Sequence, residues 1–359
     1  HMLSSLTRVF SAGITQGIAR LMSSEPVAKK LCTMKKIGTH NGTFHCDEVL
    51  ACFLLKQLPE YTDAEIIRTR DPGTLDTCDI VVDVGGVFDP EKHRYDHHQR
   101  TFSENMHSLR PEKKWVTKLS SAGLVYLHFG ERIIAKLIAK TVDDDITKTI
   151  YDKVYEQFVE EIDAVDNGVS QTDGESRYHI TTTLSSRVAN LNPAWNENNV
   201  NVQAQFEKAM QLVGGEFKDR VNYFTNSWWP ARTLVVEAFS KRQEVDPSGE
   251  ILLLGEGGCP WKDHLFLIEA EQNITPSIKY VLFTDQNGKW RVQCAPAALG
   301  SFKSRLPLPE EWCGLRDNEL SEKSGIPGGI FVHANGFIGG NETFDGALAM
   351  ARKSLNMRT

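Results

Sequence analysis

Ile80-Val81-Val82-Asp83-Val84 is the stretch that decides the fold. Four of its five residues are apolar and β-branched, which is typical of a central strand buried on both faces of a parallel sheet. Asp83 stands near the carboxyl end of the predicted strand, and open α/β sheets bind their ligands at that edge. The stretch therefore predicts an α/β sheet and makes Asp83 a candidate site residue.

Short apolar runs alternate with longer helical periodicity on both sides of this strand, over residues 36–194. Such alternation is the signature of a parallel α/β sheet. The short apolar runs and the helical stretches lie at residues 37–39, 49–58, 64–68, 121–138 and 147–165, and the longest two, 121–138 and 147–165, are predicted helices. We predict that they form one α/β domain over residues 34–195, with 80–84 as its central strand.

The segment LNPAWNENNVNV, residues 191–202, is rich in Asn and contains Pro193, a composition that suits a loop or an interdomain connection. After it we predict a linker helix near 203–224 and a smaller α+β domain, together spanning 196–359. The chain closes with a Gly-rich segment at 328–340 and a helix near 344–354. Strand-like runs of this second part lie at 233–237, 251–254, 265–269, 279–283 and 290–293.

The N-terminal segment MLSSLTRVFSAGITQGIARLMSS, residues 2–24, is similar to a mitochondrial presequence, because it contains no acid, two arginines and many small hydroxyl residues. Its apolar residues recur every three or four positions and would form one face of an amphipathic helix. We predict a targeting segment over residues 1–33 and a location in the mitochondrial matrix. The alternative is a short surface helix or a disordered tail. Met22 and Met34 could start shorter forms, which leaves a second, nuclear pool open.

The net charge of -7 is unevenly distributed. Residues 1–30 carry four basic residues and one acid, a net charge of +3, so the remainder carries -10. So acidic a chain after residue 30 argues against a broad basic surface for duplex nucleic acid, and we expect any contact with nucleic acid to be local.

Seven cysteines without a Cys-x-x-Cys pair fit a reducing compartment. No run of about 18 apolar residues occurs, so we expect no membrane partner.

Histidines and acids are concentrated in the first half of the chain. Of the ten histidines after His1, five lie between residues 40 and 98, and two of them are adjacent in Asp96-His97-His98. The segment HNGTFHCDE, residues 40–48, follows the first predicted strand and leads into a helix, so its loop can direct several ligands into one crevice. Imidazole and carboxylate suit Mn²⁺, Mg²⁺ or Zn²⁺, whereas the shortage of paired cysteines disfavours a structural zinc site or an iron–sulfur cluster.

The candidate metal ligands are sufficient in number for two ions. Two ions can share a bridging carboxylate and activate a water molecule for attack on phosphorus. We predict Asp83 as the bridge and Mn²⁺ as the preferred ion, with Mg²⁺ or Zn²⁺ as alternatives. The candidates are His40, His45, Asp47, Asp83, His97 and Asp166.

These motifs resemble those of the DHH phosphoesterase superfamily, with Asp96-His97-His98, an upstream His-x-x-x-x-His-x-Asp, an Asp at a strand end and a later Asp. From residue 37 onwards the chain is more closely similar to the Myg (melanocyte-proliferating-gene) family. The resemblance implies a DHH-type parallel-sheet domain, a smaller DHHA1-like α+β domain, and hydrolysis of phosphodiester bonds. The shared motifs are IGTHNGTFHCDE, DIVVDVGG, HRYDHHQR, EIDAVDNG and GGIFVHANGFIGG.

The resemblance also implies roles for individual residues. It makes His40, Asp47, Asp83, His97 and Asp166 metal ligands. It places His98 at the scissile phosphate or behind the ligands, so we assign catalytic roles to His98 and Asp83. Superfamily members usually carry His-x-x-x-Asp-x-Asp as the first motif, whereas this chain has one extra residue and His45 where the first Asp is expected. Imidazole in place of carboxylate removes one negative charge, which puts occupancy of a second metal site in question.

The motif EIDAVDNG offers two acids, Asp163 and Asp166, three residues apart on the same face of a predicted helix. We prefer Asp166 as the ligand, because it is nearer to the Asn-Gly helix stop, where a side chain can turn into the crevice.

A candidate substrate motif lies in the second part of the chain and resembles the GGGH-containing motif of the DHH-associated domain. Glycines let backbone N–H groups approach a phosphate or a terminal nucleotide closely, and the histidine could bond to it. Without the resemblance, a Gly-rich turn with a buried His is the simpler interpretation. Arg187 is a further candidate phosphate ligand, with solvated surface charge as its alternative. The motif residues are Gly328, Gly329, His333, Gly339 and Gly340.

The leading functional hypothesis is a metal-dependent 3′ to 5′ exonuclease that acts on single-stranded RNA through one or two metal ions. A small-molecule phosphatase or pyrophosphatase is the rival within enzymes, although no dense basic motif suits so highly charged a substrate. A non-catalytic regulator that binds metal and RNA is the alternative from a different class, and the substituted first motif is its main support.

Overall fold

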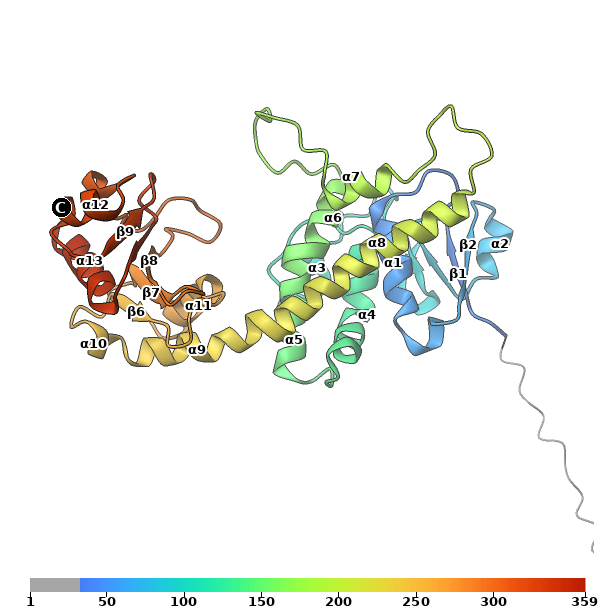
Figure 1. Cartoon of the computed structure of the whole chain (residues 1–359). Coiled ribbons are helices and arrows are strands. Elements are labelled where there is room, and N and C mark those ends of the chain that lie inside the picture. Colours follow the sequence, from blue (N-terminus) through green and yellow to red (C-terminus); the bar gives the residue numbers. More distant parts are fainter. Residues whose placement is uncertain (1–32, 359) are drawn as a thin grey trace, which may run out of the picture. The chain divides into compact units, whose positions relative to one another are not determined.

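The computed structural model describes residues 33–358 (Figure 1). The predicted targeting segment lies outside the described residues except for Thr33. Two five-stranded sheets are present in the described part of the chain.

The first sheet has the strand order β2-β1-β3-β5-β4. Strands β2, β1, β3 and β5 are parallel, and the short β4 pairs antiparallel with β5 at one edge. The α/β prediction is therefore confirmed, with residues 80–82 as the central strand. The strand bounds are β1 Lys36–Thr39, β2 Glu65–Arg68, β3 Ile80–Val82, β4 Phe88–Asp89 and β5 Arg94–Tyr95.

Strand β3 ends two residues earlier than the sequence predicts. Its three residues are buried, as expected of a central strand, but Asp83 has a φ of 61° and leaves the extended conformation. Asp and Asn tolerate this left-handed conformation better than other side chains with a Cβ do. The prediction that the strand includes Asp83 is thus wrong, but the residue directly follows the strand and lies at the carboxyl edge of the sheet, where it was expected.

Helices pack against the first sheet and share one apolar core with it. The helix predicted at residues 121–138 matches α4, and the periodicity at 147–165 corresponds to three consecutive helical stretches, α5, η3 and α6. The helix bounds are α1 Cys46–Lys56, η1 Pro59–Tyr61, α2 Pro72–Asp76, η2 Pro90–Lys92, α3 Met106–Leu109, α4 Ser121–Ile138, α5 Asp145–Val154, η3 Tyr155–Val159, α6 Glu160–Asp166, α7 Leu184–Ala189 and α8 Val202–Tyr223.

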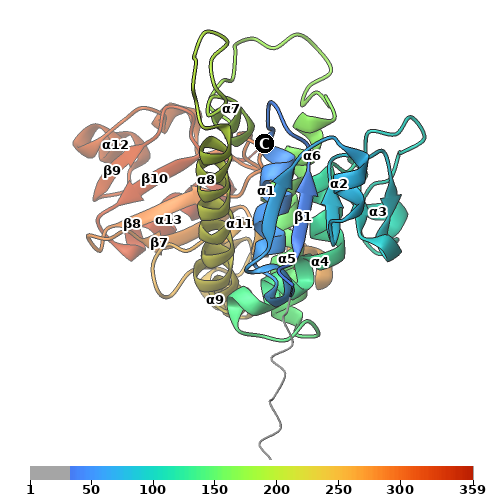
Figure 2. The same ribbon diagram turned by 90° about the vertical axis from the view of Figure 1, so that its right-hand side faces the viewer.

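Helix α8 runs alongside α1 (Figures 1 and 2), and its residues Phe206, Val213 and Phe217 belong to the core of the first sheet. Gly214 allows the close approach of the two helices, since a Cβ added there would lie 2.2 Å from the Phe53 ring of α1. The first core therefore extends beyond the Asn-rich segment at residues 191–202.

The second sheet has the order β6-β7-β8-β10-β9, in which β6 and β7 are parallel and the other pairs antiparallel. Helices α12 and α13 contribute to one apolar cluster of this sheet, and α9 and α11 to another. The element bounds are η4 Phe224–Trp228, α9 Trp229–Ser240, α10 Arg242–Val245, β6 Ile251–Leu253, α11 Lys262–Glu271, β7 Tyr280–Thr284, β8 Trp290–Cys294, η5 Glu310–Trp312, α12 Asp317–Ser324, β9 Gly329–Val332, β10 Ile338–Asn341 and α13 Phe344–Asn356.

Two of the strand-like runs, at residues 233–237 and 265–269, are helical, and the prediction of strands there is wrong. The first lies in α9, whose buried residues Ala231, Val235 and Ala238 follow the spacing of one helix face. The second lies in α11, where Leu265 and Ile268 are buried three residues apart. Short apolar runs do not distinguish a strand from a segment of buried helix.

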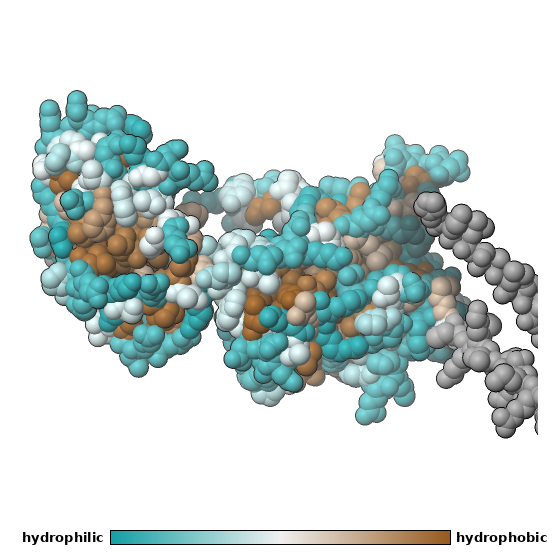
Figure 3. All heavy atoms as spheres, turned by 60° about the horizontal axis from the view of Figure 1, so that its bottom comes forward, coloured by the Kyte–Doolittle hydropathy of each residue, from teal (hydrophilic) through white to brown (hydrophobic). Residues whose placement is uncertain are grey.

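The face shown in Figure 3 is largely hydrophilic, with apolar side chains gathered in separate patches. Among residues 33–358, no helix combines the length and the apolarity needed to cross a bilayer.

Candidate metal centre

Three neighbouring strands of the first sheet deliver ligand side chains to the same edge. His40 follows β1, Asp83 follows β3, and Asp96, His97 and His98 follow β5. Because parallel strands end at one edge, residues from distant motifs meet there without any loop having to cross the sheet.

Two helix ends complete the cluster. His45 is the N-cap of α1, and Asp47 lies in the first turn of that helix. Asp166 is the last residue of α6. All six predicted metal-binding residues therefore lie in one cluster, together with Glu48 and Asp96.

The distances within the cluster are those of ligands around small ions. Asp83 lies between two histidines, with its Oδ2 3.1 Å from His40 Nε2 and its Oδ1 3.4 Å from His97 Nδ1. His97 Nε2 is 2.8 Å from Asp166 Oδ2. Four sets of three or four ligand atoms each lie within 4.8 Å of one another, and they share members such as Asp47 and Asp83. This overlap gives one continuous cluster rather than separate ion pairs.

Several buried atoms of the cluster have no hydrogen-bond partner among the described residues. They are Asp47 Oδ1, Glu48 Oε2, Asp83 Oδ1 and His97 Nδ1. Buried polar groups are normally satisfied, so a concentration of unsatisfied acceptors in one place is what a cation-binding site would show. The donor set, imidazole nitrogen and carboxylate oxygen, fits divalent ions such as Mn²⁺ or Zn²⁺. The residues present therefore fit a divalent metal.

Glu48 belongs to this cluster but was not among the predicted site residues. Its Oε1 accepts a hydrogen bond from the backbone N–H of His45 at 2.8 Å and lies 3.1 Å from His40 Nε2. In sequence, an acid three residues after a helix cap is explained by the capping box alone. Only its full burial, with Oε2 unsatisfied, distinguishes it from an ordinary capping residue.

Four groups of the cluster hold a proton more tightly than they would in water. Burial raises the pKa of Asp47, Glu48 and Asp83, and in Asp47 and Asp83 repulsion from a neighbouring carboxylate is the next cause. In His40, burial opposes protonation, but hydrogen bonds with Asp83 and Glu48 raise its pKa to about 10. A metal that binds these atoms must therefore displace protons.

We expect the metal-free protein to lose stability as pH rises from about 6.5 towards about 10, the interval between the ordinary pKa of His40 and its pKa in the folded protein. Groups whose pKa is higher in the folded than in the unfolded state bind extra protons on folding, so the free energy of unfolding falls as pH passes through that interval. Urea unfolding in chelator at several pH values measures this. Added Mn²⁺ should oppose the fall, because it binds the deprotonated cluster. A free energy of unfolding that rises with pH in chelator would contradict the assignment.

Asp96 orients the two histidines that follow it. Its buried carboxylate accepts hydrogen bonds from the backbone N–H of Gly86 at 2.6 Å and of His97 at 2.8 Å, and its Oδ1 lies 2.7 Å from His98 Nδ1. The hydrogen bond with Asp96 also raises the pKa of His98. The His98 ring is 61% exposed, so its other nitrogen is accessible to a ligand.

The structure separates the two acids of α6. Asp163 is fully buried and accepts hydrogen bonds from Ser120 N at 3.0 Å, Ser120 Oγ at 2.7 Å, Gly123 N at 3.0 Å and Tyr155 Oη at 2.9 Å. These donors lie at the start of α4 and in η3. Asp166, by contrast, faces His97, and only Asp166 of the two is placed with the candidate ligands.

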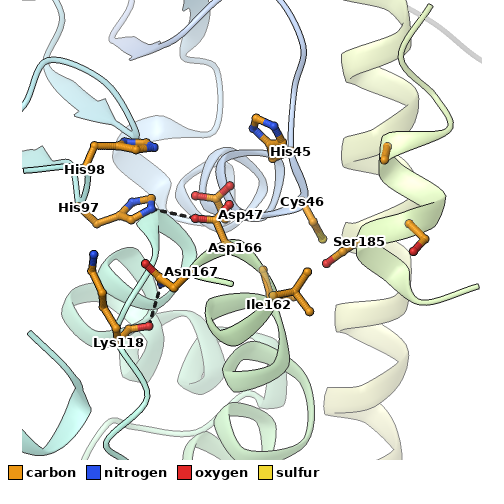
Figure 4. Close-up of a pocket in the computed structure, with 13 residues that line it drawn as sticks. His45, Cys46, Asp47, His97, His98, Lys118, Ile162, Asp166, Asn167 and Ser185 are labelled. Atoms are coloured by element: carbon orange, nitrogen blue, oxygen red, sulfur yellow. Dashed lines mark hydrogen bonds and ion pairs between the residues drawn. The ribbon is translucent and has the colours of Figure 1, made fainter. Parts of the chain in front are cut away.

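A cavity of about 670 Å³ opens beside the cluster (Figure 4). His45, Asp47, His97, His98 and Asp166 line one part of it. The rest is lined by the first residue of α1, by residues of α6 and its C-cap, by α7 and by the segment before α4, namely Cys46, Lys118, Ile162, Val165, Asn167, Ser185, Ser186 and Ala189. The cavity can hold a ligand in contact with the cluster.

The structure does not bring the predicted substrate residues into this cavity. Arg187 forms an ion pair with Glu216 of α8. His333 is exposed in the turn between β9 and β10, where its Nδ1 accepts a hydrogen bond from Asn335 N at 3.1 Å. The prediction that Arg187 and His333 bind substrate rests on sequence alone.

The glycines of the β9–β10 segment are explained by packing. Gly339 and Gly340 lie in β10, which pairs with β8 on one side and β9 on the other. A Cβ at Gly340 would lie 2.7 Å from Arg291 Nη1, and one at Gly329 would lie 3.0 Å from Leu320. Gly328 has a φ of 76°. The hairpin therefore accounts for these glycines without a ligand.

Comparison with known proteins gives a consistent family match. The model of the MYG1 exonuclease family, described as an uncharacterised protein family (UPF0160), matches residues 36–355. The MYG1 exonuclease of Mus musculus is 59% identical over 96% of this chain and 93% of the relative, and that of Homo sapiens is 59% identical over 92% and 88%. The MYG1 protein of Saccharomyces cerevisiae is 43% identical over 89% of this chain and 96% of the relative.

One solved structure is also similar. A pGpG-specific phosphodiesterase from Vibrio cholerae covers 90% of this chain and 98% of its own, with 16% identity and a TM-score of 0.26. A score this low assigns no residue of the site.

Proposed function

Because the chain belongs to the MYG1 exonuclease family, we propose that it is a divalent-metal-dependent exonuclease that hydrolyses phosphodiester bonds of single-stranded RNA in the 3′ to 5′ direction. The observation that carries the proposal is the cluster of buried carboxylates and imidazoles with unsatisfied atoms beside an open cavity. The RNA substrate and the direction follow from the family resemblance of the motifs.

The cluster residues would hold the metal, with Asp83 between His40 and His97 and with Asp47 between Asp83 and Asp166. Bound divalent ions supply an activated water and positive charge for the developing charge on phosphate, and we propose Mn²⁺ as the preferred ion. Ser121 Oγ donates a hydrogen bond to Asp47 Oδ2 at 2.6 Å and so fixes that carboxylate.

His98 is the residue best placed to act on the substrate itself. Asp96 holds its Nδ1, and its exposed ring lines the cavity. With a raised pKa, His98 is more often protonated near neutral pH and can donate a hydrogen bond from Nε2 to a phosphate oxygen. A proton at the same atom could pass to the leaving oxygen.

The cavity lining favours a nucleotide over pyrophosphate. Ile162, Val165 and Ala189 present carbon surface beside the cluster, and a sugar or a base can cover such surface whereas pyrophosphate has none. The non-catalytic alternative predicts that the protein binds metal but does not hydrolyse RNA. An RNA hydrolysis assay distinguishes it from the exonuclease.

We expect the full-length chain to shorten 5′-end-labelled single-stranded RNA stepwise with Mn²⁺, and to lose the activity in chelator. A 3′-end label should be released at once as a mononucleotide if the direction is 3′ to 5′. Single-stranded DNA and pyrophosphate serve as competing substrates. If the protein released phosphate from pyrophosphate and did not hydrolyse RNA, the exonuclease hypothesis would be wrong and a pyrophosphatase would take its place. If no substrate were hydrolysed with Mn²⁺, Mg²⁺ or Zn²⁺, the non-catalytic binding protein would be the remaining hypothesis.

We further propose location in the mitochondrial matrix, with a second nuclear pool from shorter forms. The support is the presequence-like composition of residues 2–24. Imaging a tagged full-length chain beside a form that starts at Met34 tests this, and an identical distribution of the two would contradict it.

A further inference from the structure

Among residues 33–358, Lys118 is the only lysine or arginine that lines the cavity beside the cluster. Its side chain is half-buried, and it forms no ion pair within residues 33–358. Two nearby lysines of the same segment do have acidic partners, since Lys113 Nζ lies 2.6 Å from Asp152 and Lys114 Nζ lies 2.8 Å from Glu156. Lys118 thus differs from its neighbours in having an ammonium group that is directed to the cavity and remains uncompensated.

The backbone of Lys118 is fixed relative to the candidate ligands. Its carbonyl oxygen accepts a hydrogen bond from Asn167 Nδ2 at 3.0 Å, and Asn167 directly follows Asp166. On the other side, residue 118 forms a β-bridge with Asn105. Figure 4 shows the Lys118 side chain rising from this anchor toward His97.

The surroundings of the ammonium suit an anion. Lys118 Nζ lies 5.8 Å from the centre of the Phe102 ring, which partly shields it from water and makes a cation–π contact. An ammonium group next to an apolar ring and without a carboxylate partner binds a phosphate more strongly than a fully hydrated one does, because less water has to be displaced. The acids that line the cavity, Asp47 and Asp166, belong to the cluster, where a bound metal would neutralise their charge and so reduce their repulsion of an anion.

We propose that Lys118 is a substrate-binding residue whose ammonium donates a hydrogen bond to a non-bridging oxygen of the phosphate that enters this cavity. The inference rests on the proposed function in that it requires a phosphate ester as ligand, but it does not require turnover.

The test is equilibrium binding of adenosine 5′-monophosphate, inorganic phosphate and adenosine to the full-length chain with Mn²⁺. Lys118→Met keeps an apolar stem of about the same length but removes the ammonium, Lys118→Arg keeps the charge, and Lys114→Met is the control outside the cavity. We expect Lys118→Met to weaken binding of the monophosphate and of phosphate about 10- to 100-fold, the usual loss for a charged hydrogen bond. Adenosine, which has no phosphate, should bind the variant and the wild type equally.

Each outcome decides the inference. Unchanged monophosphate binding in Lys118→Met would overturn it, and so would an equal loss of adenosine and monophosphate binding, which would indicate a structural role. If phosphate binding depended on Lys118 but the protein did not hydrolyse RNA, the proposed function would be wrong and this inference would still hold. If the protein hydrolysed RNA normally but bound phosphate equally well without Lys118, the proposed function would stand and this inference would be wrong.

Discussion

Asp83→Asn is expected to lower kcat/KM for RNA hydrolysis by about 1,000-fold or more while leaving the metal-free protein folded. Asp83 is the carboxylate that lies within 3.4 Å of both His40 and His97, so neutralising it removes a shared ligand. Loss of several kcal/mol of metal-derived transition-state stabilisation corresponds to a factor of this order. Asn is the suitable replacement, because it tolerates the φ of 61° at this position, whereas Ala would add backbone strain.

Thermal unfolding with and without Mn²⁺ separates this loss from misfolding. In chelator the variant should remain folded, because repulsion from Asp47 is relieved while the amide oxygen of Asn can still accept a hydrogen bond from His40. Stabilisation by Mn²⁺, which amounts to about 2.7 kcal/mol at 100 times the Kd for one site, should largely disappear. Asp76→Asn, at an exposed acid of α2, is the control and should change neither quantity. Turnover of Asp83→Asn within a few-fold of the wild type would refute the metal centre.

Asp163→Ala is expected to lower the free energy of unfolding by about 4 kcal/mol, since each buried donor left unsatisfied costs about 1–3 kcal/mol. The carboxylate accepts hydrogen bonds from Ser120, Gly123 and Tyr155 and ties α6 to the start of α4. Burial raises the pKa of Asp163 to about 7, so urea unfolding is best measured near pH 8, where the ionised form accepts these bonds.

The neighbouring Asp166→Ala provides the contrast. It should reduce metal binding and hydrolysis, yet lower the free energy of unfolding in chelator by only about 1–3 kcal/mol, because His97 Nε2 is the one buried group that loses its 2.8 Å contact with Asp166. Equal destabilisation by both substitutions would mean that the two acids have not been assigned correctly.

The position of the site was predictable because it depends on local pattern. The apolar run before Asp83 specifies a buried strand, and ligands at the carboxyl ends of parallel strands are brought together by the sheet. The same local reasoning failed for α9 and α11, where the stretches predicted as strands are only five residues long and carry too little periodicity to distinguish strand from helix.

The sequence by itself determined the α/β class of the first part, the six clustered candidate ligands and the family. Only the tertiary structure decided the roles of residues whose partners lie far along the chain. Ser120, which is 43 residues from Asp163, makes that acid structural, and Asn167, 49 residues from Lys118, fixes the lysine beside the cavity. Short-range spacing specifies an element and its exposed face, but burial and hydrogen bonding are set by segments that meet only when the chain has folded.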